Sequence, residues 1–388
     1  MVTPHTRAAL AGRSGPLAVL DLDAADRNAA ALVERASGLP LRVASKSIRV
    51  PALLRRLLDT PGYRGILAYS LPEALNLVAE GFTDIVVAYP TADRAALETL
   101  ARSRAALEQV TLMVDSAEHV TALGSLSPHQ PFRICLDIDA SLRLPGGIHI
   151  GPRRSPIHTV EDAVRVTTSI LALPTVRLVG LMCYEGHVAG VGNASRSLRG
   201  MLVRWMQGMA VRDLRERRTA IVAAVGELAE LEFVNGGGTG SLETSAAEGS
   251  LTEIAAGSGI YSPALFDHYR HFRHAPALFL ASPVVRHPAP GWATVFTGGW
   301  IASGPAGADR LPVVDWPHGL AYSPTEGPGE VQTPLRGSAA DQLALGDLVF
   351  FRPAKAGEPL DHFPSIAVVS DGVLIDEWDT YRGLGWAA

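Results

Sequence analysis

The residue best placed for chemistry is a lysine in the stretch "LRVASKSIRV", residues 41–50. Leu41 and Val43 indicate a buried strand, and Lys46 follows it between two serines, before a helix that begins at Pro51. A charged amine next to a buried strand is costly unless it is exposed or used. Lys46 is therefore either a solvated strand end or a reactive amine.

Two glycine-rich loops lie far from Lys46 along the chain, in "NGGGTGS" (235–241) and "AAGSGIY" (255–261). Successive backbone N–H groups and hydroxyls in such loops bind anions, and two neighbouring loops suit a single phosphate. Each loop alone is equally well explained by a tight turn. The first loop can expose successive N–H groups from Gly236 to Gly240 together with the hydroxyls of Thr239 and Ser241, and Gly257, Ser258 and Gly259 can do the same in the second.

Short apolar runs alternate with amphipathic segments such as 71–81 and 91–107. The runs are nearly continuous and rich in Val, Ile and Leu, which is typical of strands buried on both faces. They cover residues 17–23, 41–46, 65–70, 84–89, 110–116, 132–140, 176–185 and 231–237. Eight such strands with helices between them predict an α/β fold with a (β/α)8 TIM-type barrel. A doubly wound sheet is the alternative, but no "GxGxxG" turn supports it.

The sequence pattern changes after about residue 265, where prolines and glycines become frequent and predicted strands follow one another without helices. "SIAVVSDGVLIDEW" contains a tight "SDG" turn between two strands. We expect a barrel domain over residues 17–265 and an antiparallel β domain over residues 266–388.

The bulk composition excludes several classes of protein. Hydrophobic residues make up 47% and charged residues 19% of the 388 positions, so a large core can form. The net charge of −5 gives no electrostatic footprint for nucleic acid or an anionic membrane. No apolar run is long enough to span a bilayer, and the first residues lack a signal core. We expect a cytoplasmic protein whose cysteines, Cys135 and Cys183, are reduced.

A closed barrel explains how the lysine and the loops act together. Functional groups gather at the carboxyl ends of barrel strands, and the first and last strands are neighbours. Lys46 and the glycine loops therefore meet. An amine beside a phosphate site is what an aldehyde phosphate cofactor needs, because the amine forms a Schiff base and the loops anchor the phosphate.

The motifs "RVASKSIRVP", "YEGH", "NGGGTG" and "TEIAAGSGIY" together resemble the fold-type III pyridoxal-phosphate enzymes of the alanine-racemase fold. The most similar branch is that of D-threonine aldolase and D-serine dehydratase. The resemblance implies pyridoxal 5′-phosphate as cofactor. It also implies a β domain that takes in residues 1–16 and completes the active site across a homodimer.

The resemblance also implies roles for single residues. Lys46 would be the Schiff-base lysine, and Tyr184 would lie against the cofactor ring or its imine, unless it is a core tyrosine. His187 would orient substrate or cofactor, with a surface-loop histidine as the alternative. Arg143 would contact the cofactor's ring oxygen or the substrate carboxylate. Arg153 and Arg154 are nearby candidates, unless they only form a solvated basic loop. Gly238, Thr239, Gly240, Gly257 and Ser258 would hold the phosphate.

The branch that the chain resembles uses a divalent metal bound by a His-x-Cys or His-x-Asp pair in the β domain. The matching positions here are Lys355 and Gly357, neither of which is a usable ligand. Either no metal binds, or it has moved to neighbours such as Glu358, Asp361 and His362. A Lys355 ammonium in the metal's place would polarise the substrate by charge, unless Lys355 is only a solvated loop lysine.

The implied reaction is cleavage or formation of the Cα–Cβ bond of a β-hydroxy-α-amino acid of D configuration, a lyase reaction with small amino-acid and aldehyde substrates. Dehydration of D-serine or D-threonine is the first alternative, and racemisation is the second. A non-catalytic pyridoxal-phosphate-binding protein is the third, and the large β domain argues against it.

Overall fold

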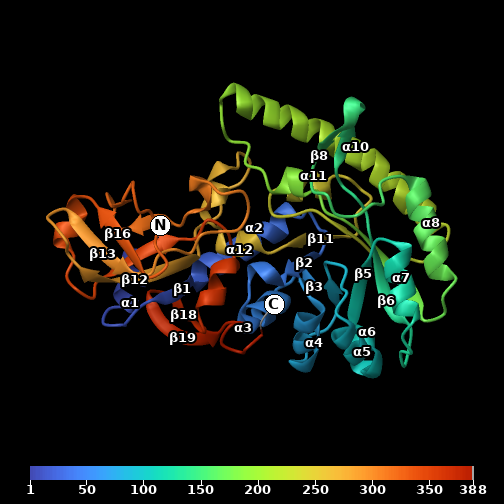
Figure 1. Cartoon of the computed structure of the whole chain (residues 1–388), viewed down its shortest axis with the longest axis horizontal. Coiled ribbons are helices and arrows are strands. Elements are labelled where there is room, and N and C mark those ends of the chain that lie inside the picture. The colour runs from blue at the N-terminus through green and yellow to red at the C-terminus, as the bar shows by residue number, and fades with distance from the viewer. Residues whose placement is uncertain (387–388) are drawn as a thin grey trace. The chain divides into compact units, whose positions relative to one another are not determined.

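The computed structural model describes residues 1–386, which form two compact units (Figure 1). One unit consists of residues 32–46 and 56–257, and we call it the barrel unit. The other consists of residues 1–31, 47–55 and 258–386, and we call it the β unit. Helices α2 (Leu22–Arg35) and α3 (Pro51–Leu58) each contain residues of both units.

The barrel unit is built on a closed barrel of eight parallel strands, in the order β10-β11-β2-β3-β4-β5-β6-β9. The (β/α)8 barrel expected from the sequence is thus confirmed. Its strands are β2 (Leu41–Ala44), β3 (Tyr63–Ala68), β4 (Ile85–Val87), β5 (Val110–Val114), β6 (Phe132–Asp137), β9 (Val176–Cys183), β10 (Phe233–Gly236) and β11 (Glu253–Ala256).

One of the expected barrel strands belongs elsewhere. Residues Leu17–Asp21 form β1, which pairs with strands of the β unit, and the eighth barrel strand is instead β11. A continuous apolar run shows that a strand is buried on both faces, but it does not show which sheet contains it. The domain boundaries at 17–265 and 266–388, with residues 1–16 in the β domain, stay a prediction.

Six helices of the barrel unit begin after residues whose side chains accept a hydrogen bond from the first turn, which is typical of helix N-caps. These residues are Ser70, Asp93, Ser103, Ser116, Thr159 and Ser197. They precede α4 (Leu71–Ala79), α5 (Arg94–Arg102), α6 (Arg104–Gln109), α7 (Ala117–Gly124), α8 (Val160–Leu171) and α10 (Leu198–Gly226). The segment expected as one helix over 91–107 is thus two, because Ser103 ends α5 and caps α6.

A layer of apolar side chains fills the barrel, and each of the strands β3, β4, β5, β6, β9, β10 and β11 contributes to it. The layer consists of Leu67, Val86, Met113, Cys135, Val179, Met182, Phe233 and Ala255. Cys135 and Cys183 are free, buried thiols, as expected. Among the described residues, no helix is both long and apolar enough to cross a membrane.

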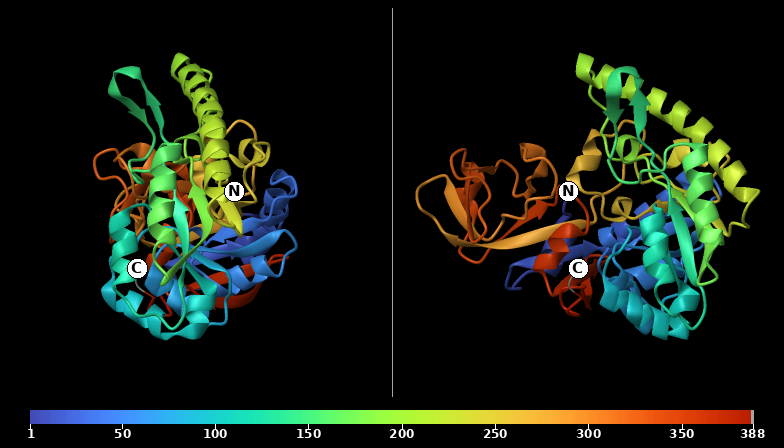
Figure 2. Two further views of the ribbon diagram at one scale, coloured as in Figure 1. Left: turned by 90° about the vertical axis from the view of Figure 1, so that its right-hand side faces the viewer. Right: turned by 45° about the vertical axis from the view of Figure 1, so that its right-hand side comes forward.

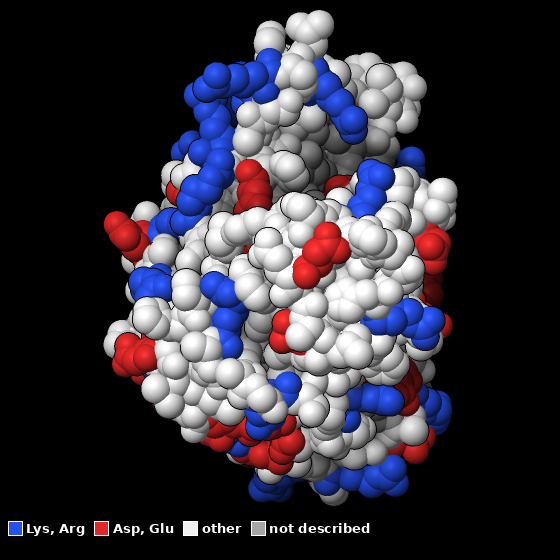
Figure 3. All heavy atoms as spheres, turned by 90° about the vertical axis from the view of Figure 1, so that its left-hand side faces the viewer, with Lys and Arg blue, Asp and Glu red and all other residues white. Residues whose placement is uncertain are grey.

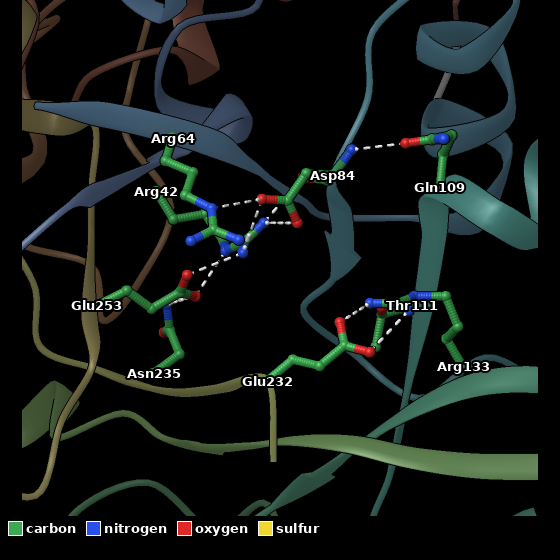
Figure 4. Close-up of polar contacts among 9 residues, drawn as sticks. All are labelled: Arg42, Arg64, Asp84, Gln109, Thr111, Arg133, Glu232, Asn235 and Glu253. Atoms are coloured by element: carbon green, nitrogen blue, oxygen red, sulfur yellow. Dashed lines mark hydrogen bonds and ion pairs between the residues drawn. The ribbon is translucent and has the colours of Figure 1, made fainter. Parts of the chain in front are cut away.

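A buried ion network joins the amino ends of the barrel strands (Figure 4). The Arg42 guanidinium donates from Nε to Glu253 Oε1 at 2.6 Å and from Nη1 to Asp84 Oδ1 at 2.9 Å. Asn235 Nδ2 donates to the same Glu253 oxygen at 2.8 Å. Arg42 and Glu253 are almost wholly buried. Burial alone would lower the pKa of Arg42, but the two carboxylates raise it above its ordinary value.

A hairpin and a long helix project from the barrel unit (Figure 2). The hairpin consists of β7 (Leu142–Leu144) and β8 (Ile148–Ile150), and Leu142 packs with Ala210 of α10. The first half of α10 exposes four apolar side chains at helical spacing, namely Leu198, Met201, Leu202 and Trp205. The helix also carries six arginines, and basic side chains gather at the top of Figure 3, where Figure 1 shows α10.

The β unit contains a nine-stranded sheet in the order β15-β16-β13-β12-β1-β18-β19, with β17 pairing with β12 and β14. Its further strands are β12 (Leu278–Arg286), β13 (Trp292–Phe296), β14 (Val313–Trp316), β15 (Ala321–Tyr322), β16 (Gln332–Arg336), β17 (Leu348–Arg352), β18 (Ser365–Ser370) and β19 (Val373–Asp379). The "SDG" turn joins β18 to β19 as expected. Asp371 and Gly372 both have positive φ, which is the backbone of a type I′ hairpin.

Candidate active site

Lys46 lies in a single 3-10 turn, Ser45–Ser47, directly after β2, and its side chain is exposed. Its Nζ donates a hydrogen bond of 2.9 Å to the phenol oxygen of Tyr89, which follows β4. Both residues therefore stand at the carboxyl ends of the two strands that flank β3, and barrel enzymes place their chemistry at these ends. The chain has only one other lysine, Lys355.

A guanidinium and a second phenol complete this group. The Arg154 Cζ atom lies 5.7 Å from the ring centroid of Tyr89 and 5.7 Å from that of Tyr184, within cation–π range of both. Tyr184 follows β9 directly. The structure thus brings together Lys46, Tyr89, Arg154 and Tyr184, which we call the lysine cluster.

The surroundings push the pKa values of the two phenols in opposite directions. Burial would raise the pKa of Tyr89, but the positive charges of Lys46 and Arg154 lower it below the ordinary tyrosine value. Burial and the Glu185 carboxylate raise the pKa of Tyr184 to about 12. Two like groups whose pKa values differ in this way are suited to different tasks. Tyr184 stays a neutral hydrogen-bond donor, whereas Tyr89 is the one that more readily gives up its proton.

A carboxyl group at the end of β6 also has a shifted pKa. Burial raises the pKa of Asp137 to about 7, and the negative charges of Asp115 and Asp139 add to the effect, while Arg154 opposes it. Asp115 is itself paired with His119, Oδ1 to Nδ1 at 3.0 Å. Near neutral pH, the Asp137 carboxyl is therefore partly protonated.

Replacing Asp137 with asparagine should stabilise the protein at pH 8 by on the order of 4 kcal/mol. The folded state holds the Asp137 proton more tightly than the unfolded chain, so wild-type stability falls as the pH rises from about 4 to about 7. Asparagine carries no such proton, so the gain should shrink as the pH is lowered to 4. Denaturant unfolding at several pH values measures it, and a gain independent of pH would contradict the assignment.

The first glycine loop is held by a buried carboxylate. Gly237, at a φ of 76°, donates its N–H to Glu185 Oε2 at 3.1 Å. Gly238 donates to Ser241 Oγ at 3.1 Å, and that hydroxyl donates to Glu185 Oε1 at 2.9 Å. Arg218 of α10 neutralises Glu185 from 3.0 Å. The loop is thus fixed from beneath before any ligand binds.

The same loop lies against the lysine cluster. A Cβ atom built on Gly238 would come within 3.1 Å of the Tyr184 ring and 3.0 Å of the Ala189 side chain, so a larger residue would push these neighbours away by a few tenths of an ångström. Behind it, Arg35 Nη2 donates to the Thr239 carbonyl at 2.7 Å. Gly257 directly follows β11, the next strand round the barrel. An amine, two phenols and a glycine cradle fit an aldehyde cofactor with a phosphate group.

His187 and Arg143, two residues assigned to the site from the sequence, are not members of the lysine cluster. His187 is buried in the short helix α9 (Gly186–Ala189), and neither ring nitrogen has a hydrogen-bond partner among residues 1–386. Burial lowers its pKa, so the ring is neutral. Arg143, on β7, donates to Asp139 Oδ2 at 2.7 Å. Arg154 is therefore the arginine of this segment that contacts the tyrosines.

The stretch considered for a metal belongs to the β unit. Lys355 Nζ donates to the Ser303 carbonyl at 2.6 Å, and the Ser303 hydroxyl donates to Glu358 at 3.0 Å. Asp361 forms an ion pair with Arg49, and His362 is exposed. Within the described part of the chain, no three His, Cys, Asp or Glu side chains gather as metal ligands would.

Sequence reasoning gave no role to Tyr89, Glu185 or Arg218. Tyr89 stands at a strand end, which was the available signal, and Glu185 lies inside the "YEGH" motif. Arg218 is one of many arginines on α10, and no local pattern distinguishes it.

The chain belongs to the family described as alanine racemase, N-terminal domain, whose model matches residues 20–262. It is 26% identical over 372 residues to a D-threonine aldolase of an Arthrobacter species, covering 94% of this chain and 91% of that protein. It is also 26% identical over 296 residues to 3-hydroxy-D-aspartate aldolase of Paracoccus denitrificans, covering 73% of this chain and 71% of the relative.

Solved structures share the fold at lower identity. D-threonine aldolase from Filomicrobium marinum superposes with a TM-score of 0.80 at 23% identity, covering 95% of each chain. D-threo-3-hydroxyaspartate dehydratase from Delftia sp. HT23 superposes with a TM-score of 0.74 at 21% identity, covering 96% of this chain and 98% of the other. The neighbours of this fold thus include both an aldolase and a dehydratase.

Proposed function

We propose that the protein is a pyridoxal-phosphate-dependent lyase that cleaves or forms the Cα–Cβ bond of a β-hydroxy-α-amino acid of D configuration. The observation that supports this proposal is the lysine cluster, in which the Lys46 amine is hydrogen-bonded to the Tyr89 phenol beside a glycine loop held in place by buried side chains. The aldolases among the relatives support the reaction class.

The residues that would hold the cofactor come from several strand ends. Lys46 would bond covalently to it, and Thr239, Gly240, Gly257 and Ser258 would contact its phosphate. Bound there, the cofactor would supply a carbonyl carbon for the lysine and an acceptor for the electron pair released at Cα. Gly238 has its N–H occupied by Ser241, so its part is to let the loop approach Tyr184.

The other side chains would orient the bound molecules and form the walls of the site. The neutral Tyr184 hydroxyl would donate a hydrogen bond, and the Arg154 cation would attract the carboxylate of an amino acid or the ring oxygen of the cofactor. Arg143 is engaged by Asp139, so we assign that contact to Arg154 instead. His187, buried and neutral, would shape the wall of the site rather than transfer protons.

Absorbance spectroscopy with borohydride reduction tests the cofactor, and product analysis tests the reaction. D-threonine and D-serine would each be incubated with the loaded enzyme. Glycine plus an aldehyde would establish the aldolase, whereas a keto acid plus ammonia would establish a dehydratase. A protein that binds no chromophore when supplied with pyridoxal phosphate would overturn the proposal.

Dehydration is the second candidate, because a dehydratase is among the structural neighbours. It needs a base at Cα and an acid that protonates the departing hydroxide. Lys46 would be the base, and Asp137, whose pKa lies at about 7, is a carboxyl group able to give a proton near neutral pH. Product analysis separates the two reactions.

The metal requirement is tested separately. If Lys355 replaces a metal, turnover should survive EDTA and fall at least tenfold in Lys355→Ala. Full turnover in Lys355→Ala would show that the lysine only stabilises its loop, through its hydrogen bond to the Ser303 carbonyl. Loss of turnover in EDTA, restored by a divalent metal, would instead point to ligands such as Asp361 and His362.

We also propose that the protein is a cytoplasmic homodimer. The exposed apolar face of α10, at Leu198, Met201, Leu202 and Trp205, supports association with a second copy, since exposed apolar patches of this kind mark contact surfaces. Sedimentation analysis would check the oligomeric state.

A further inference from the structure

Tyr89 is the one member of the lysine cluster that the proposed function leaves without a task. Its oxygen accepts a 2.9 Å hydrogen bond from Lys46 Nζ, and Arg154 lies over its ring. The Lys46 nitrogen also lies 5.6 Å from the ring centroid. The phenol therefore stands between two cations, both of which favour a negative charge on its oxygen.

We propose that Tyr89 is the proton acceptor for Lys46, taking up the proton that Lys46 Nζ must lose before its nitrogen can bond to a carbonyl carbon. The acceptor is the Tyr89 phenolate. One N–H bond of the Lys46 ammonium breaks, one O–H bond forms on the phenolate oxygen, and the electron pair left on nitrogen becomes the nucleophile. The reverse transfer returns the proton when Lys46 is released. This inference rests on the proposed function, because it assigns the activation of the same lysine.

The charges around Tyr89 support this direction of transfer. Lys46, Arg154, Asp137 and Tyr184 are the charged or titratable groups that act on it electrostatically, from four separate segments of the barrel unit. Burial and the Asp137 carboxyl would raise the pKa of Tyr89, but the two cations outweigh them, and the pKa is lowered as a result. Tyr184 cannot substitute, because its own pKa is raised to about 12.

Carbon-13 labelling of the tyrosine Cζ atoms followed by NMR titration tests the ionisation in the full chain without cofactor. One of the eight tyrosines should ionise below pH 10, and its signal should be missing in Tyr89→Phe. Arg154→Gln should move that ionisation to higher pH. The adjacent Arg153→Gln and the distant Tyr322→Phe are the matched controls and should leave it in place.

The rate of cofactor incorporation tests whether Tyr89 accepts the proton from Lys46. At pH 7.5, Tyr89→Phe should take up pyridoxal phosphate at least tenfold more slowly than the wild type, and the deficit should close as the pH approaches 10, because hydroxide then removes the proton. Equal rates at pH 7.5 would overturn the proposal. A deficit that persists at every pH would overturn it too, since Tyr89 would then only position the lysine.

The two experiments separate this inference from the proposed function. A wild type that takes up no cofactor would refute the proposed function, and the NMR titration would still decide whether Tyr89 is ionised beside Lys46. An ordinary titration for Tyr89, with the cofactor bound normally, would refute the inference alone.

Discussion

Replacing Lys46 with methionine should abolish covalent attachment of pyridoxal phosphate and lower turnover by about 10³-fold or more. Methionine keeps the length of the side chain but has no amine, so the covalent bond to the cofactor cannot form. The phosphate contacts would remain, because the glycine loop is held by Glu185 and Arg218 and not by the lysine. The variant should therefore still bind the cofactor, but reversibly.

The chain is suited to a direct measurement of this loss, because Lys46 and Lys355 are its only lysines. After borohydride reduction, mass spectrometry should find the cofactor on the Lys46 peptide of the wild type and nowhere in Lys46→Met. Lys355→Met is the matched control and should keep the label on Lys46. Label on Lys355, or label retained by Lys46→Met, would refute the assignment.

Replacing Arg42 with methionine should cost about 3–5 kcal/mol in the free energy of unfolding. The substitution leaves the Glu253 carboxylate buried without its cation, and Asn235 alone cannot offset the charge. The barrel closes where β11 pairs with β2, and the Arg42–Glu253 ion pair joins these two strands. Denaturant unfolding monitored by circular dichroism measures the loss.

An exposed ion pair supplies the control for Arg42. Arg94 and Glu98 lie 3.0 Å apart on the surface of α5, and Arg94→Met should cost less than about 1 kcal/mol. Adding Glu253→Gln to Arg42→Met should recover part of the stability, because it removes the uncompensated charge. A small loss in Arg42→Met would show that the buried carboxylate finds another partner or takes up a proton.

Much of the barrel could be predicted because its strands are buried on both faces. Such strands are continuous apolar runs, and seven of the expected runs overlap barrel strands. The strand at 17–21 is a similar apolar run but pairs with β12 and β18. Hydrophobicity reports burial and not the identity of the neighbouring strand, so only the folded chain distinguishes the two sheets.

The sequence by itself determined the type of chemistry. It placed an amine at a strand end and glycines where backbone must approach closely, and these properties depend on residue type and local backbone alone. The tertiary structure decided which groups act on one another. Tyr89 lies beside Lys46 because β4 and β2 both border β3 in the barrel. Arg218, on helix α10, donates a hydrogen bond to Glu185, which lies 33 positions earlier in the chain. Arg143 lies on the hairpin at 142–150 and pairs with Asp139, whereas Arg154 follows that hairpin and contacts the tyrosines. Such pairings depend on distances through space, and the order of residues along the chain does not encode those distances locally.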